Sequence, residues 1–219
     1  MPGVIVAVFY LIVIILGILS MGFQLLGSRL LNPHFGSSII VWAWLISTFL
    51  AAFSLGSLLG GWISSLPAPR RFRLQLAAAT GAVLTLAFTA AFGRGVLDAI
   101  EIRFENVSTA LLVSCLGLFF VPVTMLSCFG PQCVQFLAAR GTKPGAASGV
   151  IYGISTVGNI AGVMLTAFVL LPNIKVSSLL YVWLGVAITA LAGLLTLLRR
   201  AEAGNAAPAA ASSPVTPPR

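Results

Sequence analysis

Six long apolar runs constrain the fold of this chain more than any other feature of its sequence. They cover roughly Val4–Leu26, Ile39–Gly61, Leu74–Phe92, Thr109–Cys128, Ser148–Leu171 and Ser177–Leu198. A helix needs about 20 apolar residues, each rising about 1.5 Å, to cross about 30 Å of hydrocarbon. The runs do not alternate between polar and apolar residues as the strands of a membrane barrel do. The sequence therefore predicts an all-α, polytopic membrane protein with about six transmembrane helices.

Charged residues are scarce, and their placement excludes several functional classes. They make up 7% of the 219 residues, against about 25% in soluble domains. The net charge is +8, but the basic residues lie in short connections between apolar runs. Membrane topology and lipid headgroups explain that placement better than nucleic-acid binding does. We expect the lipid bilayer as a partner and no nucleic acid.

The basic residues also divide unevenly between the two sides of the predicted membrane domain. One side carries eight of them: Arg70, Arg71, Arg73, Arg140, Lys143, Arg199, Arg200 and Arg219. The other carries four, Arg29, Arg94, Arg103 and Lys175, together with Asp98, Glu101 and Glu105. By the positive-inside rule, both termini are expected in the cytoplasm of a multi-pass protein of the bacterial inner membrane.

Two segments outside the apolar runs have predictions of their own. Residues 1–200 form the six-helix domain, and the Ala/Pro-rich residues 201–219 are expected to be a disordered cytoplasmic tail. The connection "GRGVLDAIEIRFENVS" is predicted to be the longest loop of the opposite side. Within it, "LDAIEIRF" has the pattern of a short amphipathic helix at the membrane surface.

The sequence gives no support for catalysis. None of its four acidic residues lies in an apolar run, and no glycine-rich phosphate loop is present. Cys115, Cys128 and Cys133 lack CxxC spacing and a nearby histidine, so we expect no metal site, no disulfide and no cofactor. We therefore predict that the chain is not an enzyme.

Small residues four positions apart mark two of the apolar runs. The glycines concerned are Gly56 and Gly60, Gly149 and Gly153, and Gly158 and Gly162. Such stripes allow helix backbones to approach closely in lipid. Static packing within the chain is the simpler interpretation, and partner docking is the alternative. If the chain docks on a partner, Leu at Gly158 or Gly162 is expected to release that partner without preventing insertion.

A few polar residues and prolines interrupt the apolar runs. Gln24, Arg29 and Asn159 are candidates for a polar cavity or for hydrogen bonds between helices. Pro122 is expected to kink the fourth run because it removes one backbone hydrogen bond.

The stretch "GSRLLNPHFGSSIIVWAW" is predicted to be a hairpin between the first two helices. Arg29 ends the first span, Pro33 stops its helix, Gly36 allows a turn and Ser37 or Ser38 caps the second helix. His34 is expected to be a solvated loop residue. The expected anchors at the membrane interface are Trp42, Trp44, Arg70, Arg71 and Arg73.

Two blocks of this sequence resemble the membrane domain of the fused transporter-like/spermidine synthase family. They are "QLLGSRLLNPHFGSSIIVWAWLISTFLAAFSLGSLLGGW" and "SGVIYGISTVGNIAGVMLTAFVLLP". The first block supplies residues of that family's pattern: Arg29, Leu30, Leu31, Pro33, Phe35, Gly36, Ser37, Ser38, Trp42, Leu55, Gly56, Gly60 and Gly61. The resemblance implies a fold similar to half of a major facilitator transporter, placed in that family before an aminopropyltransferase domain.

The chain departs from this family in three respects. Gln24 stands where the family often has Glu, "WISSLPAPRR" lacks an acidic residue after the Gly-Gly pair, and no aminopropyltransferase domain is present. The first two departures weaken a case for transport of polyamines, because a polycation is bound by carboxylates. The third removes the catalytic part.

Three functions are consistent with these patterns. The favoured one is a non-catalytic membrane subunit or anchor that packs against other proteins in a membrane complex. The second is a half-size transporter of small cationic solutes that works as a dimer. The third is an anchor for a separately encoded aminopropyltransferase. The subunit is favoured because ionisable residues that line a transport route are missing from the apolar runs.

Overall fold

The computed structural model describes residues 2–206 of the chain, with side chains described for residues 3–200. Its helices are α1 (Pro2–Phe35), α2 (Ile39–Ser64), α3 (Ala68–Arg103), α4 (Val107–Cys115), η1 (Leu116–Phe120), α5 (Val121–Ser127), α6 (Phe129–Ala138), α7 (Pro144–Met164), η2 (Leu165–Leu170), α8 (Leu171–Asn173) and α9 (Val176–Ala206). Together they form six segments that are long and apolar enough to cross a membrane. The prediction of an all-α, polytopic membrane protein is therefore confirmed.

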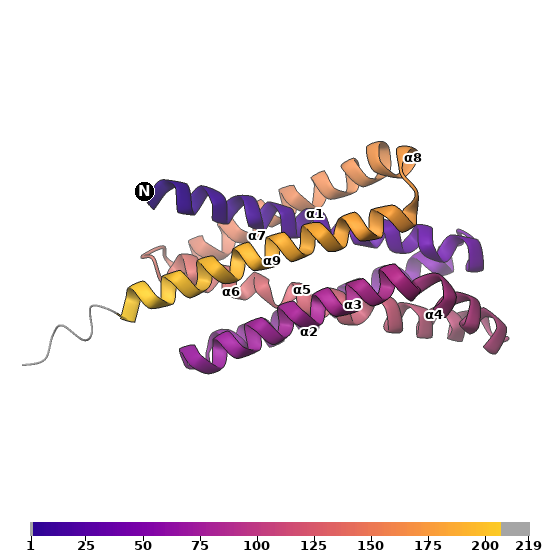
Figure 1. Cartoon of the computed structure of the whole chain (residues 1–219), viewed down its shortest axis with the longest axis horizontal. Helices are drawn as coiled ribbons and strands as arrows, with labels where there is room; N and C mark the ends of the chain where they lie inside the picture. The colour runs from indigo at the N-terminus through magenta and orange to yellow at the C-terminus, as the bar shows by residue number, and fades with distance from the viewer. Residues whose placement is uncertain (1, 207–219) are drawn as a thin grey trace, which may run out of the picture.

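The six spans form one bundle of antiparallel helices (Figure 1). The α1 helix packs along α7 and α9, α2 packs along α5 and α6, and α3 contacts both α5 and α9. The beginning of α1 and the end of α9 lie at the same end of the bundle (Figure 1). This arrangement is the one that an even number of spans requires.

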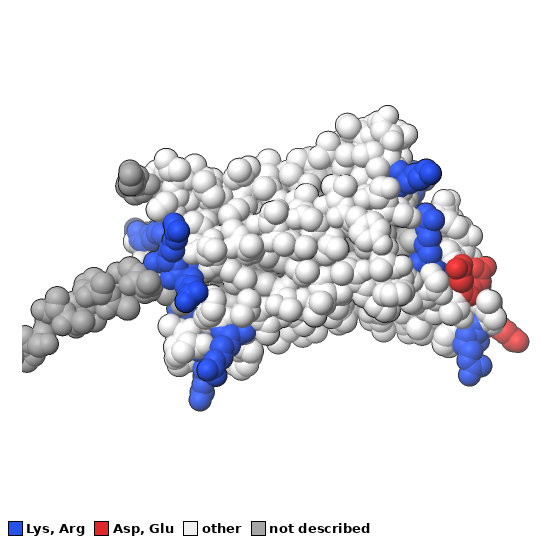
Figure 2. All heavy atoms as spheres, viewed as in Figure 1, with Lys and Arg blue, Asp and Glu red and all other residues white. Residues whose placement is uncertain are grey.

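Figure 2 shows charged side chains at the two ends of the bundle and none on the belt between them, which the apolar spans form. We call the end with Arg70, Arg71, Arg73, Arg140, Lys143, Arg199 and Arg200 the basic end. We call the end with Arg29, Arg94, Arg103, Lys175, Asp98, Glu101 and Glu105 the mixed end. The division of charge that the connections predict is thus present in space.

The helices at the mixed end are longer than predicted. Pro33 does not stop α1, which continues to Phe35. Pro33 lacks an N–H for the carbonyl of Arg29 only, and Arg29 lies on the exposed surface at the helix end, where that loss is tolerated. The helix ends at Gly36, whose φ is +70°, and the Ser38 side chain caps α2 by accepting a hydrogen bond from the Val41 N–H.

The predicted loop between the third and fourth spans is wrong. The α3 helix continues without interruption to Arg103, and Asn106 caps the next helix three residues later. The amphipathic pattern of "LDAIEIRF" extends α3 instead of forming a separate surface helix, because fully buried Leu97 keeps this turn packed against the bundle.

Spans four and five each have one proline just after a π-helical turn. Pro122 comes after η1 and Pro172 after η2. Pro122 has no N–H to offer the carbonyl of Leu118, and the Thr89 hydroxyl of α3 donates to that carbonyl at 2.8 Å. A neighbouring helix thus replaces the missing backbone hydrogen bond.

The predicted disordered tail is partly helical. The α9 helix runs to Ala206, so residues 201–206 continue the sixth span as a helix. The remainder of the predicted tail, residues 207–219, lies outside the described residues.

Candidate functional site

The glycines of span two pack inside the bundle. A Cβ on Gly56 would collide with the carbonyl oxygen of Thr124, and one on Gly60 with that of Cys128. Both collisions are with backbone, which cannot move aside as the end of a flexible side chain can. Gly56 and Gly60 therefore hold α2 against α5 and the start of α6, and they are not free for docking.

The four glycines of span five divide into two pairs with different surroundings. A Cβ on Gly158 would collide with the carbonyl oxygen of Ile14, while one on Gly162 would lie 2.6 Å from that of Ile18. Gly149 and Gly153 have no atom within 4 Å of the position of a Cβ. The contacts of Gly158 and Gly162 thus agree with static packing, the simpler of the two interpretations, and disagree with partner docking through this pair, because α1 already covers them.

A cleft of about 230 Å³ opens between α1, α2, α5, α6 and α7. Its polar lining consists of Ser20, Ser57, Ser127, Cys133, Tyr152, Ser155, Thr156 and Asn159. Ser20 and Asn159 fall near the midpoints of their spans. We call this surface the cleft face.

The hydrogen bonds of the cleft face leave some polar groups without partners. The hydroxyls of Ser20, Ser127 and Thr156 donate to carbonyls of their own helices, at 2.9, 2.7 and 2.7 Å. Within the described residues, the Asn159 amide and the Ser155 hydroxyl have no hydrogen-bond partner. The cleft lining contains no Asp, Glu, Lys, Arg or His. The cleft face can therefore hydrogen-bond a neutral group, but it offers no charge for a cation and no proton relay.

Span five is also the least covered of the six. In its most apolar window 17% of the residues are buried, compared with 56% in span four. Tyr152 and Thr156 lie exposed on α7, close to the open glycines Gly149 and Gly153. An uncovered helix surface and unpartnered polar groups thus coincide on α7.

The structure does not bring the three predicted polar residues together. Asn159 lines the cleft face, whereas Gln24 is half-buried on α1 and has no hydrogen-bond partner among the described residues. Arg29 is exposed at the mixed end, where it lines three separate crevices.

The predicted interface residues lie at both ends of the bundle. Trp42 is 37% exposed and shares a crevice with Arg29, while Trp44 is half-buried against the core. Arg70, Arg71 and Arg73 lie in the first turns of α3, at the basic end.

The prediction for His34 is wrong. His34 lies in the last turn of α1, its side chain is only 9% exposed, and its Nε2 lies 2.9 Å from Oδ1 of Asp98 on α3. The continued α3 helix places Asp98 there, and the prediction of a loop at this position hid the pair. The 64 positions between the two residues leave no local signal in the sequence.

Other bonds between helices went unpredicted as well. Trp183 of α9 is buried and donates its indole N–H to the carbonyl of Leu19 on α1, at 3.1 Å. The Gln135 amide donates to the carbonyl of Ser64 at 2.7 Å, which ties α6 to the end of α2. Trp183 lies in an apolar run and Gln135 lies between two runs, and neither residue type identifies its acceptor in the sequence.

Groups that could hold a metal ion are not found in the described part of the chain. No three His, Cys, Asp or Glu side chains come together there. Cys115, Cys128 and Cys133 are buried and unpaired.

Comparison with known proteins adds no relative to this description. No family model, no curated protein and no solved structure matches the chain. The resemblance to the fused transporter-like/spermidine synthase family therefore rests on the two sequence blocks alone.

Proposed function

We propose that this chain is a non-catalytic membrane subunit whose cleft face packs against another protein within the bilayer. One observation carries the proposal: α7 combines the least covered apolar surface of the bundle with polar groups that have no partner. A polar group that faces hydrocarbon without a partner is unfavourable, so selection favours either its removal or its coverage.

The open glycines of α7 suit such a contact. On a helix with 3.6 residues per turn, Gly149, Gly153 and Thr156 share one side. The bare backbone at the two glycines allows a partner helix to approach closely, and the Thr156 hydroxyl on the same side, which donates to Tyr152, can accept a hydrogen bond across the contact. An interhelical hydrogen bond of this kind contributes about 0.6–2 kcal/mol.

Co-purification in mild detergent, followed by mass spectrometry, tests this proposal. Gly149→Leu and Gly153→Leu are expected to release the partner, because Leu side chains would hold its backbone away. Gly185→Leu is the matched control, since Gly185 lies mid-span in α9 and also has no atom within 4 Å of a Cβ. The proposal fails if both α7 variants retain every protein that the control retains at equal membrane abundance.

A second copy of the chain is the alternative partner. Two cleft faces that meet would enclose a polar space between two six-helix units, as expected of a dimeric half-size transporter. The cleft lining has no carboxylate, so the proposed solute for this alternative changes from a cation to a neutral molecule. The intact mass of the complex in detergent distinguishes a second copy of the chain from a different protein. An aminopropyltransferase among the captured proteins would support the third function, an anchor for that enzyme.

We also propose a bacterial inner membrane location with both termini in the cytoplasm. The support is the gathering of basic side chains at the end of the bundle where α1 begins and α9 ends (Figures 1 and 2).

A further inference from the structure

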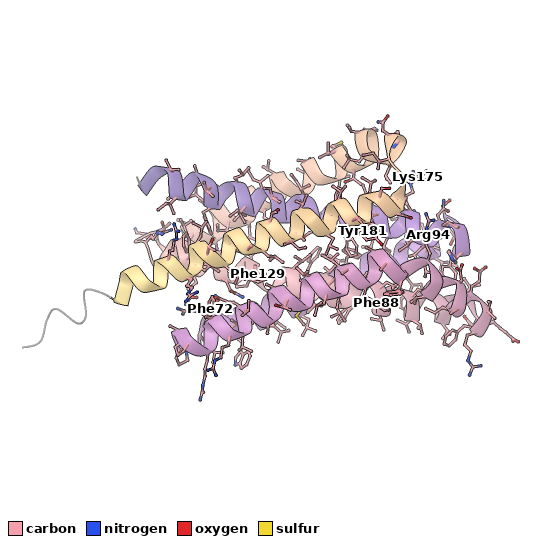
Figure 3. All side chains as sticks on the ribbon, viewed as in Figure 1. Phe72, Phe88, Arg94, Phe129, Lys175 and Tyr181 are labelled. Atoms are coloured by element: carbon pink, nitrogen blue, oxygen red, sulfur yellow. The ribbon has the colours of Figure 1, made fainter. Side chains whose placement is uncertain are left out.

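A pocket of about 290 Å³ lies at the mixed end, between α1, α3 and the start of α9. Four of its lining residues have charged or titratable side chains: Arg29 and His34 from α1, and Arg94 and Asp98 from α3. Arg94 also lies at the same end of the bundle as Lys175, which precedes α9 (Figure 3). We call this the Arg29 pocket.

The charges of the Arg29 pocket do not cancel. Its one carboxylate, Asp98, is engaged by His34 at 2.9 Å. Among the described side chains, neither Arg29 nor Arg94 has a carboxylate within ion-pair distance or any hydrogen-bond partner. With two guanidinium groups and one carboxylate, the pocket is positive and has donors free for an anion.

His34 lines the same pocket and keeps one of its ring nitrogens buried. Its side chain is 9% exposed, and its Nδ1 is buried without a hydrogen-bond partner. Buried polar atoms in folded proteins nearly always have a partner. That buried atom is out of reach of a ligand, so the pocket's donors free for an anion are the guanidinium groups of Arg29 and Arg94.

An apolar crevice adjoins the Arg29 pocket. Its volume is about 270 Å³, and Arg29 lines it together with Ala167, Leu171, Pro172 and Val176. Arg29 and Val176 line both spaces. A ligand with an anionic group and an attached hydrocarbon chain would fill both spaces at once.

We propose that the Arg29 pocket binds the phosphate of an anionic phospholipid, with an acyl chain along the adjoining crevice. Guanidinium groups suit phosphate because their paired N–H donors match its oxygens. The site also lies at the edge of the apolar belt, where lipid headgroups are found. The donors, the position and the apolar wall together select a lipid over a free anion.

Native mass spectrometry of the full chain in detergent, titrated with phosphatidylglycerol, tests the proposal. Wild type is expected to bind one lipid, and Arg29→Gln and Arg94→Gln are each expected to weaken binding about tenfold. Arg103→Gln is the matched control, because Arg103 is an exposed cation of the same end outside the pocket. Unchanged binding by both pocket variants, or equal weakening by the control, would overturn the site.

Two further probes distinguish the ligand source. Phosphatidylcholine with the same acyl chains is expected to bind about tenfold more weakly than phosphatidylglycerol, because its headgroup carries no net charge. Inorganic phosphate is expected to compete poorly, since it cannot use the apolar crevice. If inorganic phosphate binds as tightly as the lipid, the site is one for free phosphate and the lipid assignment is overturned.

Discussion

Replacing each glycine of span five by alanine separates packing inside the bundle from packing against a partner. Alanine adds one methyl group at the position where the surroundings of the glycines differ. At Gly158 and Gly162 that methyl group meets the α1 backbone at Ile14 and Ile18, whereas at Gly149 and Gly153 it meets nothing within 4 Å. All four changes are compatible with insertion into the membrane.

The expected difference in stability between the two pairs of variants follows from this difference in contact. A change from Gly to Ala favours a helix by about 0.5–1 kcal/mol at every one of the four positions, so that contribution cancels between the pairs. At Gly158 and Gly162, the inner pair, the added methyl group also forces α1 and α7 apart, whereas at Gly149 and Gly153, the outer pair, it does not. Such overpacking costs about 1–3 kcal/mol. We therefore expect Gly158→Ala and Gly162→Ala to be less stable than Gly149→Ala and Gly153→Ala by about that amount.

Unfolding in mixed micelles with a rising fraction of dodecyl sulfate, followed by circular dichroism, measures the difference. The inner variants are expected to unfold at a lower detergent fraction than wild type, and the outer variants at the same fraction or a higher one. Equal midpoints for Gly158→Ala and Gly153→Ala would refute the close contact of α7 with α1. That result would also return Gly158 to the candidates for docking.

Four other outcomes follow from the bonds and charges described above. Thr89→Val removes the hydroxyl that serves the Leu118 carbonyl and is expected to lower the unfolding free energy by about 0.6–2 kcal/mol, with Thr89→Ser as the control that keeps the bond. Trp183→Phe removes the indole N–H that donates to the Leu19 carbonyl. It is expected to lower the unfolding free energy by a similar amount in the same unfolding assay. Reporter fusions in the connection between spans two and three and after span six are both expected to report the cytoplasm; an external signal at either would contradict the orientation. Purified chain supplied with putrescine and an aminopropyl donor is expected to show background turnover only, and clear product would contradict the non-catalytic assignment.

Features that depend on local chemistry or on length could be predicted from the sequence. Apolar runs of about 20 residues leave a membrane helix as the simplest outcome, and the six spans are present. The turn at Gly36 and the cap at Ser38 follow equally directly, because a positive φ and an unpaired helix N–H each have few solutions. The charged residues could be assigned to the two ends of the bundle because they lie in the connections between the apolar runs.

Features that depend on a distant neighbour could not be predicted. Pro33 lacks a backbone N–H wherever it stands, but whether it ends the helix depends on whether the carbonyl that loses its hydrogen bond is exposed at a helix end. The bond from Thr89 to Leu118 and the contact of His34 with Asp98 join helices that no local pattern pairs. For the candidate site, the hydroxyls of α7 are visible in the sequence, yet their meeting with Ser20 and Ser57 across one cleft is not.

The glycine stripe of span five shows why a pattern alone does not assign a surface to a function. Gly153 and Gly158 are five positions apart, which turns the second pair away from the first by about 140°. The two pairs must therefore face different surroundings, but the sequence does not say which pair faces α1. Backbone atoms of Ile14 and Ile18 lie against Gly158 and Gly162. Of the four glycines, only Gly149 and Gly153 therefore remain open, on the same helix as the unpartnered Asn159 amide. A partner that docked through this stripe would therefore use the outer pair, because binding through the inner pair would first have to displace α1 from the bundle.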